Sequence, residues 1–198
     1  MKLGDIELVD LTLEGDHAAF EELVLRYQDR LYNALVQTVG CANEAHDIVQ
    51  EAFLSAFSKL SSFQKQASFY TWLYRIAFNA AISQKRKKLP SLSVDQYREE
   101  VGLDPVDRHE APDAKLDREE KVQHVQNALS ALHEEHRVIL VLREMEGLCY
   151  DSIAEILGLP VGTVRSRLHR ARGQLKETLE MMLQDVVDRR EICWFELT

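Results

Sequence analysis

The 198-residue chain lacks the features that mark several protein classes. Its three cysteines, Cys41, Cys149 and Cys193, form no C-x-x-C pair, so we expect neither a disulfide framework nor a zinc site. No apolar run reaches the ~18 residues of a membrane helix, and the chain begins without a signal-like apolar stretch. We therefore expect a cytoplasmic protein with no membrane insertion. No phosphate-binding glycine loop, metal-ligand cluster or nucleophile–base pair is present, which predicts no metal, no cofactor and no enzymatic activity.

Charge is distributed unevenly along the chain. Hydrophobic residues make up 45% and charged residues 29%, which is ordinary globular usage, and the formal net charge is −9. Residues 61–88 nevertheless hold six Lys or Arg and no acid, and residues 161–176 hold five and no acid. Residues 1–60 and 89–120 are acidic. This segregation predicts two separate nucleic-acid contact surfaces in a chain that elsewhere repels nucleic acid.

Apolar residues recur with helical spacing over most of the chain. Three amphipathic helices are predicted, over 18–39, 43–60 and from about Phe69 to Arg86, and no useful length shows strand-like alternation. Periodicity stops in an acidic stretch that holds Pro90, Pro105 and Pro112, and it resumes at Leu116. The fold class is therefore all-α, with two helical domains joined by an acidic linker. The boundaries we assign are 1–88, a flexible linker over 89–115, a second domain over 116–182, and a tail over 183–198 without an assigned role.

Two short helical patterns meet in the second domain. Ile153, Ala154 and Leu157 suit the buried face of a first helix, and Gly158-Leu159-Pro160 suits the turn, since Gly158 can end a helix in the left-handed conformation. Val164, Leu168, Ala171 and Leu175 suit the buried face of a second helix. The outward residues would then be Thr163, Arg165, Ser166, Arg167, His169, Arg170 and Arg172.

This geometry predicts a helix-turn-helix whose second helix enters the major groove of DNA. An ordinary solvated basic helix is the alternative; it is less favoured because no acid on the same helix pairs with the four Arg. We expect Arg165, Ser166 and Arg170 to read bases, and Arg167 and Arg172 to bind phosphates.

The basic stretch of the first domain is also rich in aromatic residues. Interleaved aromatics and cations suit unstacked, single-stranded bases. Phe69 and Trp72 fall on the apolar stripe and are expected in the core. The exposed candidates are Tyr70, Tyr74, Arg75 and Asn79, and Lys85 and Arg86 add to them only in combination with the aromatics.

A polar edge lies on the preceding helix. Asp47, Gln50 and Glu51 have i, i+3, i+4 spacing, so they share one face beside the apolar stripe. Such an edge suits an Arg-rich protein partner. From these residues alone, a solvated face is the favoured interpretation.

Four collinear stretches carry a resemblance. They are DHAAFEELVLRYQDRLY, HDIVQEAFLSAFSKLSSF, SFYTWLYRIAFNAAI and YDSIAEILGLPVGTVRSRLHRARGQL. The chain resembles the extracytoplasmic-function (ECF) group of bacterial RNA polymerase sigma factors, which keep the second and fourth conserved regions of the sigma-70 superfamily.

The resemblance implies roles for particular residues. Asp47, Gln50 and Glu51 would bind the clamp helices of the largest subunit of core RNA polymerase, and the flap of the second-largest subunit would be a further contact. The loop from Phe63 and the helix after it would melt the −10 promoter element and hold a flipped base, with Phe63 and Asn79 at matching positions. The helix from Val161 would read the −35 element.

Two residues depart from the family pattern. His46 stands where an acid is usual, and Cys149 replaces a serine helix cap, although a thiol is a poor hydrogen-bond acceptor. Promoter sequence and the tail cannot be assigned from the resemblance, and an anti-sigma partner is left open.

The functional prediction is a dissociable promoter-specificity subunit that binds core polymerase and promoter DNA and joins the nucleoid as part of the holoenzyme. One alternative is a homodimeric helix-turn-helix regulator that binds DNA without polymerase. Another is that the first domain serves only as a protein-interaction module. A further hypothesis from the charge pattern is that the acidic first domain and linker shield the basic helices in the free protein.

Overall fold

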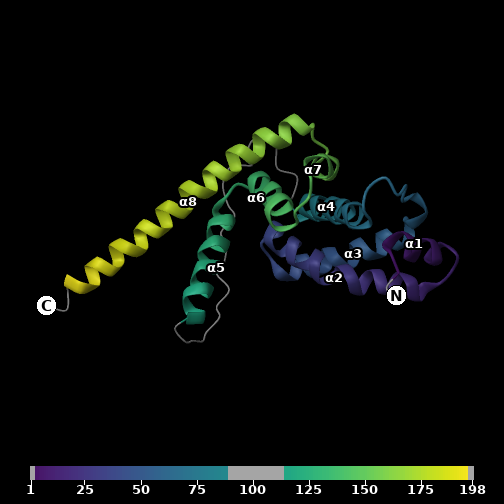
Figure 1. Cartoon of the computed structure of the whole chain (residues 1–198), viewed down its shortest axis with the longest axis horizontal. Coiled ribbons are helices and arrows are strands. Elements are labelled where there is room, and N and C mark those ends of the chain that lie inside the picture. The colour runs from purple at the N-terminus through teal and green to yellow at the C-terminus, as the bar shows by residue number, and fades with distance from the viewer. Residues whose placement is uncertain (1–2, 89–113, 196–198) are drawn as a thin grey trace.

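The computed structural model describes residues 3–88 and 114–195, in which all regular structure is helical (Figure 1). The first domain comprises α1 (Asp5–Leu13), α2 (His17–Val39), α3 (Ala42–Ser58), a 3-10 turn η1 (Leu60–Ser62) and α4 (Phe69–Lys88). The second comprises α5 (Ala114–Ala131), α6 (Glu134–Leu140), a π turn η2 (Val141–Met145), α7 (Tyr150–Leu157) and α8 (Val161–Phe195). The all-α fold is confirmed. The predicted linker, residues 89–115, lies outside the described residues up to position 113. Its last two residues form the start of α5.

The predicted helices of the first domain form close to their expected bounds, and α2 carries a capping signal at each end. The Asp16 side chain accepts a hydrogen bond from the Ala18 amide (3.0 Å) and caps α2. Gly40 ends the same helix with φ 82°, a left-handed conformation that glycine adopts without strain. Helix α1 was not predicted. It buries Leu8 and Val9 against the bundle.

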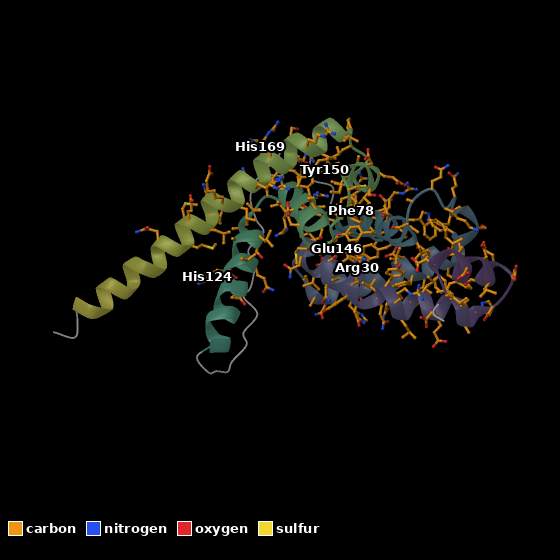
Figure 2. All side chains as sticks on the ribbon, viewed as in Figure 1. Arg30, Phe78, His124, Glu146, Tyr150 and His169 are labelled. Atoms are coloured by element: carbon orange, nitrogen blue, oxygen red, sulfur yellow. The ribbon has the colours of Figure 1, made fainter. Side chains whose placement is uncertain are left out.

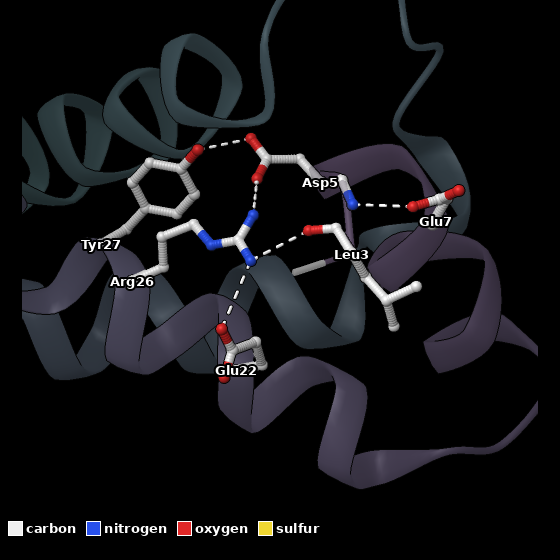
Figure 3. A network of polar contacts seen from close by, with 7 residues as sticks. Leu3, Asp5, Glu7, Glu22, Arg26 and Tyr27 are labelled. Carbon is white, nitrogen blue, oxygen red and sulfur yellow. Dashed lines mark hydrogen bonds and ion pairs between the residues drawn. The ribbon is translucent and has the colours of Figure 1, made fainter. Parts of the chain in front are cut away.

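A polar network holds α1 on the first half of α2 (Figure 3). The guanidinium of Arg26 binds Asp5 (2.7 Å), the Leu3 carbonyl (3.1 Å) and Glu22 (3.3 Å), and the Tyr27 hydroxyl donates to Asp5. Burial, with a smaller contribution from the hydrogen bond to Asp5, raises the pKa of Tyr27 to about 12. The shift keeps the phenol protonated, and able to donate, above the pH of about 10 at which an ordinary tyrosine loses its proton.

The two domains pack directly on one another. Their buried apolar residues form one continuous cluster, in which α4 packs against α7, and α2 against α6 and η2. Figure 1 shows α5 and α8 projecting from this junction, with the first domain on its other side and the chain termini toward opposite ends of the long axis. Helix α8 continues past the boundary we placed at Met182 and ends at Phe195, so residues 183–195 extend the second domain's last helix.

Candidate functional site

The helix-turn-helix forms at the predicted turn. Helix α7 ends at Gly158, whose φ of 64° is left-handed. Helix α8 begins at Val161, and the amides of Thr163 and Val164 bond to the Pro160 carbonyl at 2.9 and 3.1 Å. Proline suits this position because it has no amide hydrogen to satisfy and its φ is already close to helical.

The buried faces of the two helices agree with the prediction in most positions. On α8, Val164, Leu168 and Ala171 are buried, and Leu175 is half-buried. On α7, Ile153 is buried as expected, but the second buried position is Ile156, while Ala154 and Leu157 are half-buried. The core face of this short helix is therefore rotated from the predicted one.

The outward face of α8 carries a row of hydrogen-bond donors. Arg165, Ser166, His169 and Arg170 are exposed, while Thr163 is half-buried. Arg167 pairs with Glu135 (3.0 Å) and Arg172 with Glu144 (2.6 Å). The sequence showed no acid within reach on α8 itself; these carboxylates come from α6 and η2. The Ser166 hydroxyl donates to the Thr163 carbonyl (3.1 Å). Arg165 and Arg170 therefore form no ion pair with another described residue, whereas Arg167 and Arg172 are already paired.

Two tyrosines predicted on the open face of α4 are buried, and that prediction is wrong. Tyr74 is fully buried in the first domain, where its hydroxyl lies 3.1 Å from Thr38 Oγ1. Tyr70 is 3% exposed; its ring packs 5.4 Å from that of Tyr27, and its hydroxyl donates to Glu146 (2.8 Å). Burial raises the pKa of both phenols, and the bond to Glu146 raises that of Tyr70 further.

Phe63 is also buried, beside a surface hollow. Its ring packs against Trp72 (5.2 Å between centroids) and Phe69 (5.9 Å), and both of these residues lie in the core as predicted. The hollow, of about 450 Å³, is lined by Gly4, Asp5, Ile6, Glu7, Phe63, Ala67, Ser68 and Phe69. Asn79 lies ten residues beyond Phe69, about 15 Å along α4. The structure therefore does not bring Phe63 and Asn79 together at this hollow.

The remaining predicted residues of α4 differ in their surroundings. Asn79 and Arg86 are exposed. Arg75 pairs with Glu155 of α7 (2.8 Å), and Lys85 pairs with Glu134 of α6. Two of the predicted DNA-binding cations are thus engaged by the second domain.

Glu146, which the sequence did not single out, lies where the domains meet (Figure 2). It follows the π turn, and its side chain is 8% exposed. Its Oε2 accepts hydrogen bonds from Arg30 Nε of α2 and from the Tyr70 hydroxyl of α4, both at 2.8 Å. Nothing in the local sequence around Glu146 marks this role, because both partners are far away in the chain.

The polar edge of α3 is present as predicted. Asp47, Gln50 and Glu51 are all exposed, and Glu51 also accepts a hydrogen bond from Gln84 (3.3 Å). Leu54, three residues after Glu51, is 74% exposed. Phe57, six residues after Glu51 on the same helix, is 44% exposed. The face is therefore acidic at one end and apolar at the other. Leu54 lies three residues after Glu51 and four after Gln50. This helical spacing could have identified it from the sequence as an apolar neighbour of the polar edge.

Cys149 occupies the N-cap of α7 without a side-chain capping bond, as its poor acceptor chemistry predicts. His46 is exposed at the end of the α3 face.

Within residues 3–88 and 114–195, no helix is both long and apolar enough to cross a bilayer. Among these described residues, no three His, Cys, Asp or Glu side chains are grouped to hold a metal ion.

Comparisons with known proteins match both domains. Residues 23–89 match the family model of sigma-70 region 2, and residues 123–175 match that of sigma-70 region 4. The chain is 38% identical over 186 residues to the RNA polymerase sigma-H factor of Pseudomonas aeruginosa, covering 91% of this chain and 96% of that protein. It is also 38% identical over 189 residues to the ECF RNA polymerase sigma-E factor of Escherichia coli K12, covering 92% and 98%.

Two solved structures share the arrangement. One is CnrH in complex with the cytosolic domain of CnrY, with a TM-score of 0.64, 25% identity, and coverage of 89% of this chain and 97% of that one. The other is the sigma factor RpoE in complex with the anti-sigma factor NepR from Bartonella quintana, with a TM-score of 0.62, 26% identity, and coverage of 81% and 96%. With both sigma-70 regions matched in order and the relatives covered almost end to end, the chain belongs to the ECF group of the sigma-70 family of RNA polymerase sigma factors.

Proposed function

We propose that this chain binds core RNA polymerase and directs it to promoters, reading a −35 duplex with α8 and opening a −10 element with α4 and the loop before it. The observation that carries the proposal is a row of exposed polar and basic side chains on α8, on the outward side of a helix-turn-helix; the row is Arg165, Ser166, His169 and Arg170. Positive charge alone would favour binding to any polyanion. A row of hydrogen-bond donors on a helix that fits the major groove also allows contacts to base edges, which differ between sequences.

Residues of α8 divide by what they contact in the free protein. Arg165 and Arg170 are exposed and form no ion pair with another described residue, so they are the candidates for guanine O6 and N7. When DNA binds, Arg167 must leave Glu135 and Arg172 must leave Glu144 before each can contact a phosphate. Phosphate contacts add affinity for DNA but carry no sequence information. Exchange of this kind lowers the net gain per contact, because one charge-assisted hydrogen bond replaces another.

The −10 surface is revised by the buried tyrosines. Arg75, Lys85 and Arg86 supply cations for the strand backbone, and the hollow at Phe63 is the candidate receptor for an extruded base. Tyr74 becomes a core residue. Base capture offsets an unstacking cost of about a few kcal/mol per base, so the protein acts through binding energy and not through catalysis.

Polymerase contacts are proposed on two faces. On α3, Asp47, Gln50 and Glu51 would bind the clamp helices, with Leu54 as an apolar anchor beside them. On the second domain, a groove of about 470 Å³ is the candidate for the flap of the second-largest subunit. Its lining is Leu140, Glu144, Arg172, Leu175, Lys176, Leu179 and Glu180.

The cytoplasm and, within the holoenzyme, the nucleoid are the proposed locations. An anti-sigma factor is a proposed partner, supported by the similarity to two proteins whose solved structures are complexes with CnrY and NepR.

Run-off transcription with purified core polymerase on a genomic promoter library tests the proposal. The wild-type chain should produce start sites that core polymerase alone does not use. The double variant Arg165→Ala/Arg170→Ala should lose sites that depend on a −35 sequence. Glu177→Ala, at an exposed position further along α8 that lies outside both the donor row and the groove lining, should retain them. No new start site with the wild-type chain would overturn the proposal. A footprint on two half-sites without polymerase would instead favour a homodimeric regulator.

A further inference from the structure

Lys65, in the loop between η1 and α4, has an unusual backbone conformation. Its φ is 58°, and it is the one non-glycine residue with a positive φ in residues 3–88 and 114–195. The left-handed region is unfavourable for a residue with a Cβ, whereas glycine adopts it without strain. Such a conformation persists where the surrounding contacts hold it, and these conformations gather at functional segments. The contacts of this loop therefore indicate what holds Lys65.

Backbone hydrogen bonds anchor the loop at its ends and not in its middle. The amide of Phe63 bonds to the Leu60 carbonyl (3.0 Å), and the Phe63 ring is buried. At the other end, the Ser68 hydroxyl accepts a hydrogen bond from the Thr71 amide (3.1 Å) in the first turn of α4. Residues 64–67 form no backbone–backbone hydrogen bond with any described residue. The middle of the loop therefore depends on side-chain contacts for its position.

One side-chain contact ties the middle of the loop to α1. Lys65 Nζ donates to Asp10 Oδ1 (2.5 Å). Helix α1 is itself fixed on α2, because Asp5 binds Arg26 (2.7 Å) and accepts a hydrogen bond from the Tyr27 hydroxyl (Figure 3). The side chains of Lys65 and Asp10 are 37% and 49% exposed, so their pair contributes little to global stability. It acts instead on a local equilibrium, the choice of backbone conformation at Lys65.

Helix α1 and the loop form two sides of the hollow at Phe63. One side is lined by residues 4–7, at the start of α1, and the other by Phe63, Ala67, Ser68 and Phe69. Lys65 lies between Phe63 and Ala67, two of the loop residues that line the hollow. A change in the Lys65 backbone would therefore move one side of the hollow relative to the other.

We propose that Asp10 is a positioning residue for capture of the −10 base: its ion pair holds Lys65 in the left-handed conformation and so keeps the hollow in the shape that receives an extruded base. Helix α1 is then a functional part of the −10 surface, although the match to sigma-70 region 2 begins at residue 23, after this helix. The inference rests on the proposed function of the hollow as base receptor. Without the pair, fewer molecules keep the competent loop, and the apparent affinity falls by that fraction.

Electrostatics alone predicts the opposite sign of effect. Asp10 is an acid beside a surface proposed to bind nucleic acid, and it neutralises the charge of Lys65. If charge alone mattered, removing the Asp10 carboxylate would raise the affinity for single-stranded DNA, since Lys65 would be released to contact a phosphate. If Asp10 acts by positioning the loop, removing the carboxylate lowers that affinity. The direction of the change therefore separates the two roles.

Three full-length variants test the role of Asp10. Asp10→Asn removes the ion pair and one negative charge. Glu14→Gln removes the same charge from the C-cap of α1, outside the pair with Lys65 and outside the lining of the hollow. Asp10→Glu keeps the carboxylate and should restore wild-type behaviour. Helical content by circular dichroism should be equal in all three variants and the wild type.

A second matched pair tests the backbone of Lys65. Lys65→Gly and Lys65→Ala lose the same cation and the same ion pair. Glycine adopts the left-handed conformation without strain and alanine does not, so Lys65→Gly should bind a −10 strand more tightly than Lys65→Ala. Equal binding by these two variants would show that the conformation of Lys65 has no part in base capture, which would overturn the proposal.

The first measurement uses no DNA. A lysine-specific protease cleaves after Lys65 and after Lys59, which is the C-cap of α3, and the ratio of the two cleavage rates reports how often the loop is released. Asp10→Asn should raise this ratio by about twofold to fivefold, the effect of an ordinary exposed ion pair. Glu14→Gln and Asp10→Glu should leave it at the wild-type value. An unchanged ratio in Asp10→Asn would show that the pair does not hold the loop, and the proposal would be wrong.

The second measurement is the affinity for labelled single-stranded oligonucleotides that carry the −10 sequences of start sites created by the wild-type chain in run-off transcription. Asp10→Asn should bind them about twofold to fivefold more weakly than wild type. Glu14→Gln should bind at least as tightly as wild type. Equal or tighter binding by Asp10→Asn would overturn the proposal in favour of a purely electrostatic role.

These results separate the failure of the inference from the failure of the proposed function. If the wild-type chain creates start sites and Asp10→Asn binds their −10 strands normally, the proposed function stands and Asp10 has no positioning role. If the wild-type chain creates no start site, the proposed function falls and base capture falls with it. The cleavage ratio then still decides whether Asp10 holds the loop.

Discussion

The hydroxyl of Tyr74 lies 3.1 Å from Thr38 Oγ1, which also donates to the Ala34 carbonyl at 2.8 Å. Both Tyr74 and Thr38 are buried. This links α4 to α2 through a hydrogen bond that has no access to water. A tyrosine that helical spacing placed among the DNA contacts is thereby a core residue of the first domain.

Tyr74→Phe should lower the free energy of unfolding by about 1 kcal/mol, since it removes one buried hydrogen bond and leaves the ring in place. Tyr74→Ala should cost about 3–5 kcal/mol, because it also leaves a cavity. Chemical denaturation measures both changes. At equal folded concentration, Tyr74→Phe should transcribe as wild type does, whereas Asn79→Ala should leave stability unchanged and weaken promoter opening. A Tyr74→Phe variant of normal stability that fails to open promoters would restore the direct DNA role.

Stability should fall as pH rises above about 10, the ordinary pKa of tyrosine. Burial raises the folded-state pKa of Tyr70 and Tyr74, and that of Tyr27 to about 12. Above pH 10 the unfolded chain loses phenolic protons that the folded chain keeps, so the folded state binds more protons and rising pH favours unfolding. Denaturant midpoints measured between pH 8 and about 11 should show this decline.

Other groups titrate in the same pH range, so a variant supplies the control for the alkaline decline. Tyr27→Phe removes the phenol whose folded-state pKa is about 12 and keeps the ring that packs on Tyr70. Its midpoint should fall less steeply above pH 10 than that of wild type. Equal slopes would show that this phenol titrates alike in the folded and unfolded chain.

Leu54 offers a test of the α3 face with a matched control. Leu54 is 74% exposed on α3 and Leu25 is 60% exposed on α2, so neither loses much packing when replaced. Leu54→Asp should weaken binding to core polymerase by about 1–2 kcal/mol, as expected for an apolar anchor at an interface. Leu25→Asp should not. Thermal unfolding should shift by little in either variant, within about 0.5 kcal/mol. Equal polymerase affinity for the two variants would remove Leu54 from the interface.

Gly158 offers a test of the helix-turn-helix turn. Its φ of 64° is unfavourable for a residue with an L side chain, although a Cβ added there would meet no other atom within 4 Å. Gly158→Ala should therefore destabilise the second domain by about 1–2 kcal/mol through backbone strain alone. Gly173→Ala, which also has open space around the added Cβ but lies inside helix α8, should stabilise it by up to about 1 kcal/mol. Thermal denaturation with matched buffers compares them; a neutral Gly158→Ala would mean that the turn relaxes.

Much of the site could be predicted from local spacing. The Gly158 turn, the buried face of α8 and the polar edge at Asp47 depend on residues within a few positions of one another, and the helical repeat relates such positions directly. Helix α1 was missed because its short apolar pattern at Leu8 and Val9 has little periodicity to detect.

The environment of α4 could not be predicted in this way. Helical spacing identifies the side that carries the most apolar residues, and it assigned Phe69 and Trp72 correctly. It does not reveal that a second surface covers the opposite side. Tyr74 meets Thr38, 36 positions away, and Tyr70 meets Glu146, 76 positions away.

The sequence by itself determined the helices from α2 onward apart from the end of α8, the turn between α7 and α8, and the separation of basic from acidic stretches. Each of these follows from chemistry repeated over a few residues. Only the tertiary structure decided which donors remain free: Arg165 and Arg170 stay exposed, while Arg75 and Lys85 are paired across the domain boundary. The physical reason is that a charged or aromatic side chain acquires its role from the groups packed against it, and those groups come from distant parts of the chain.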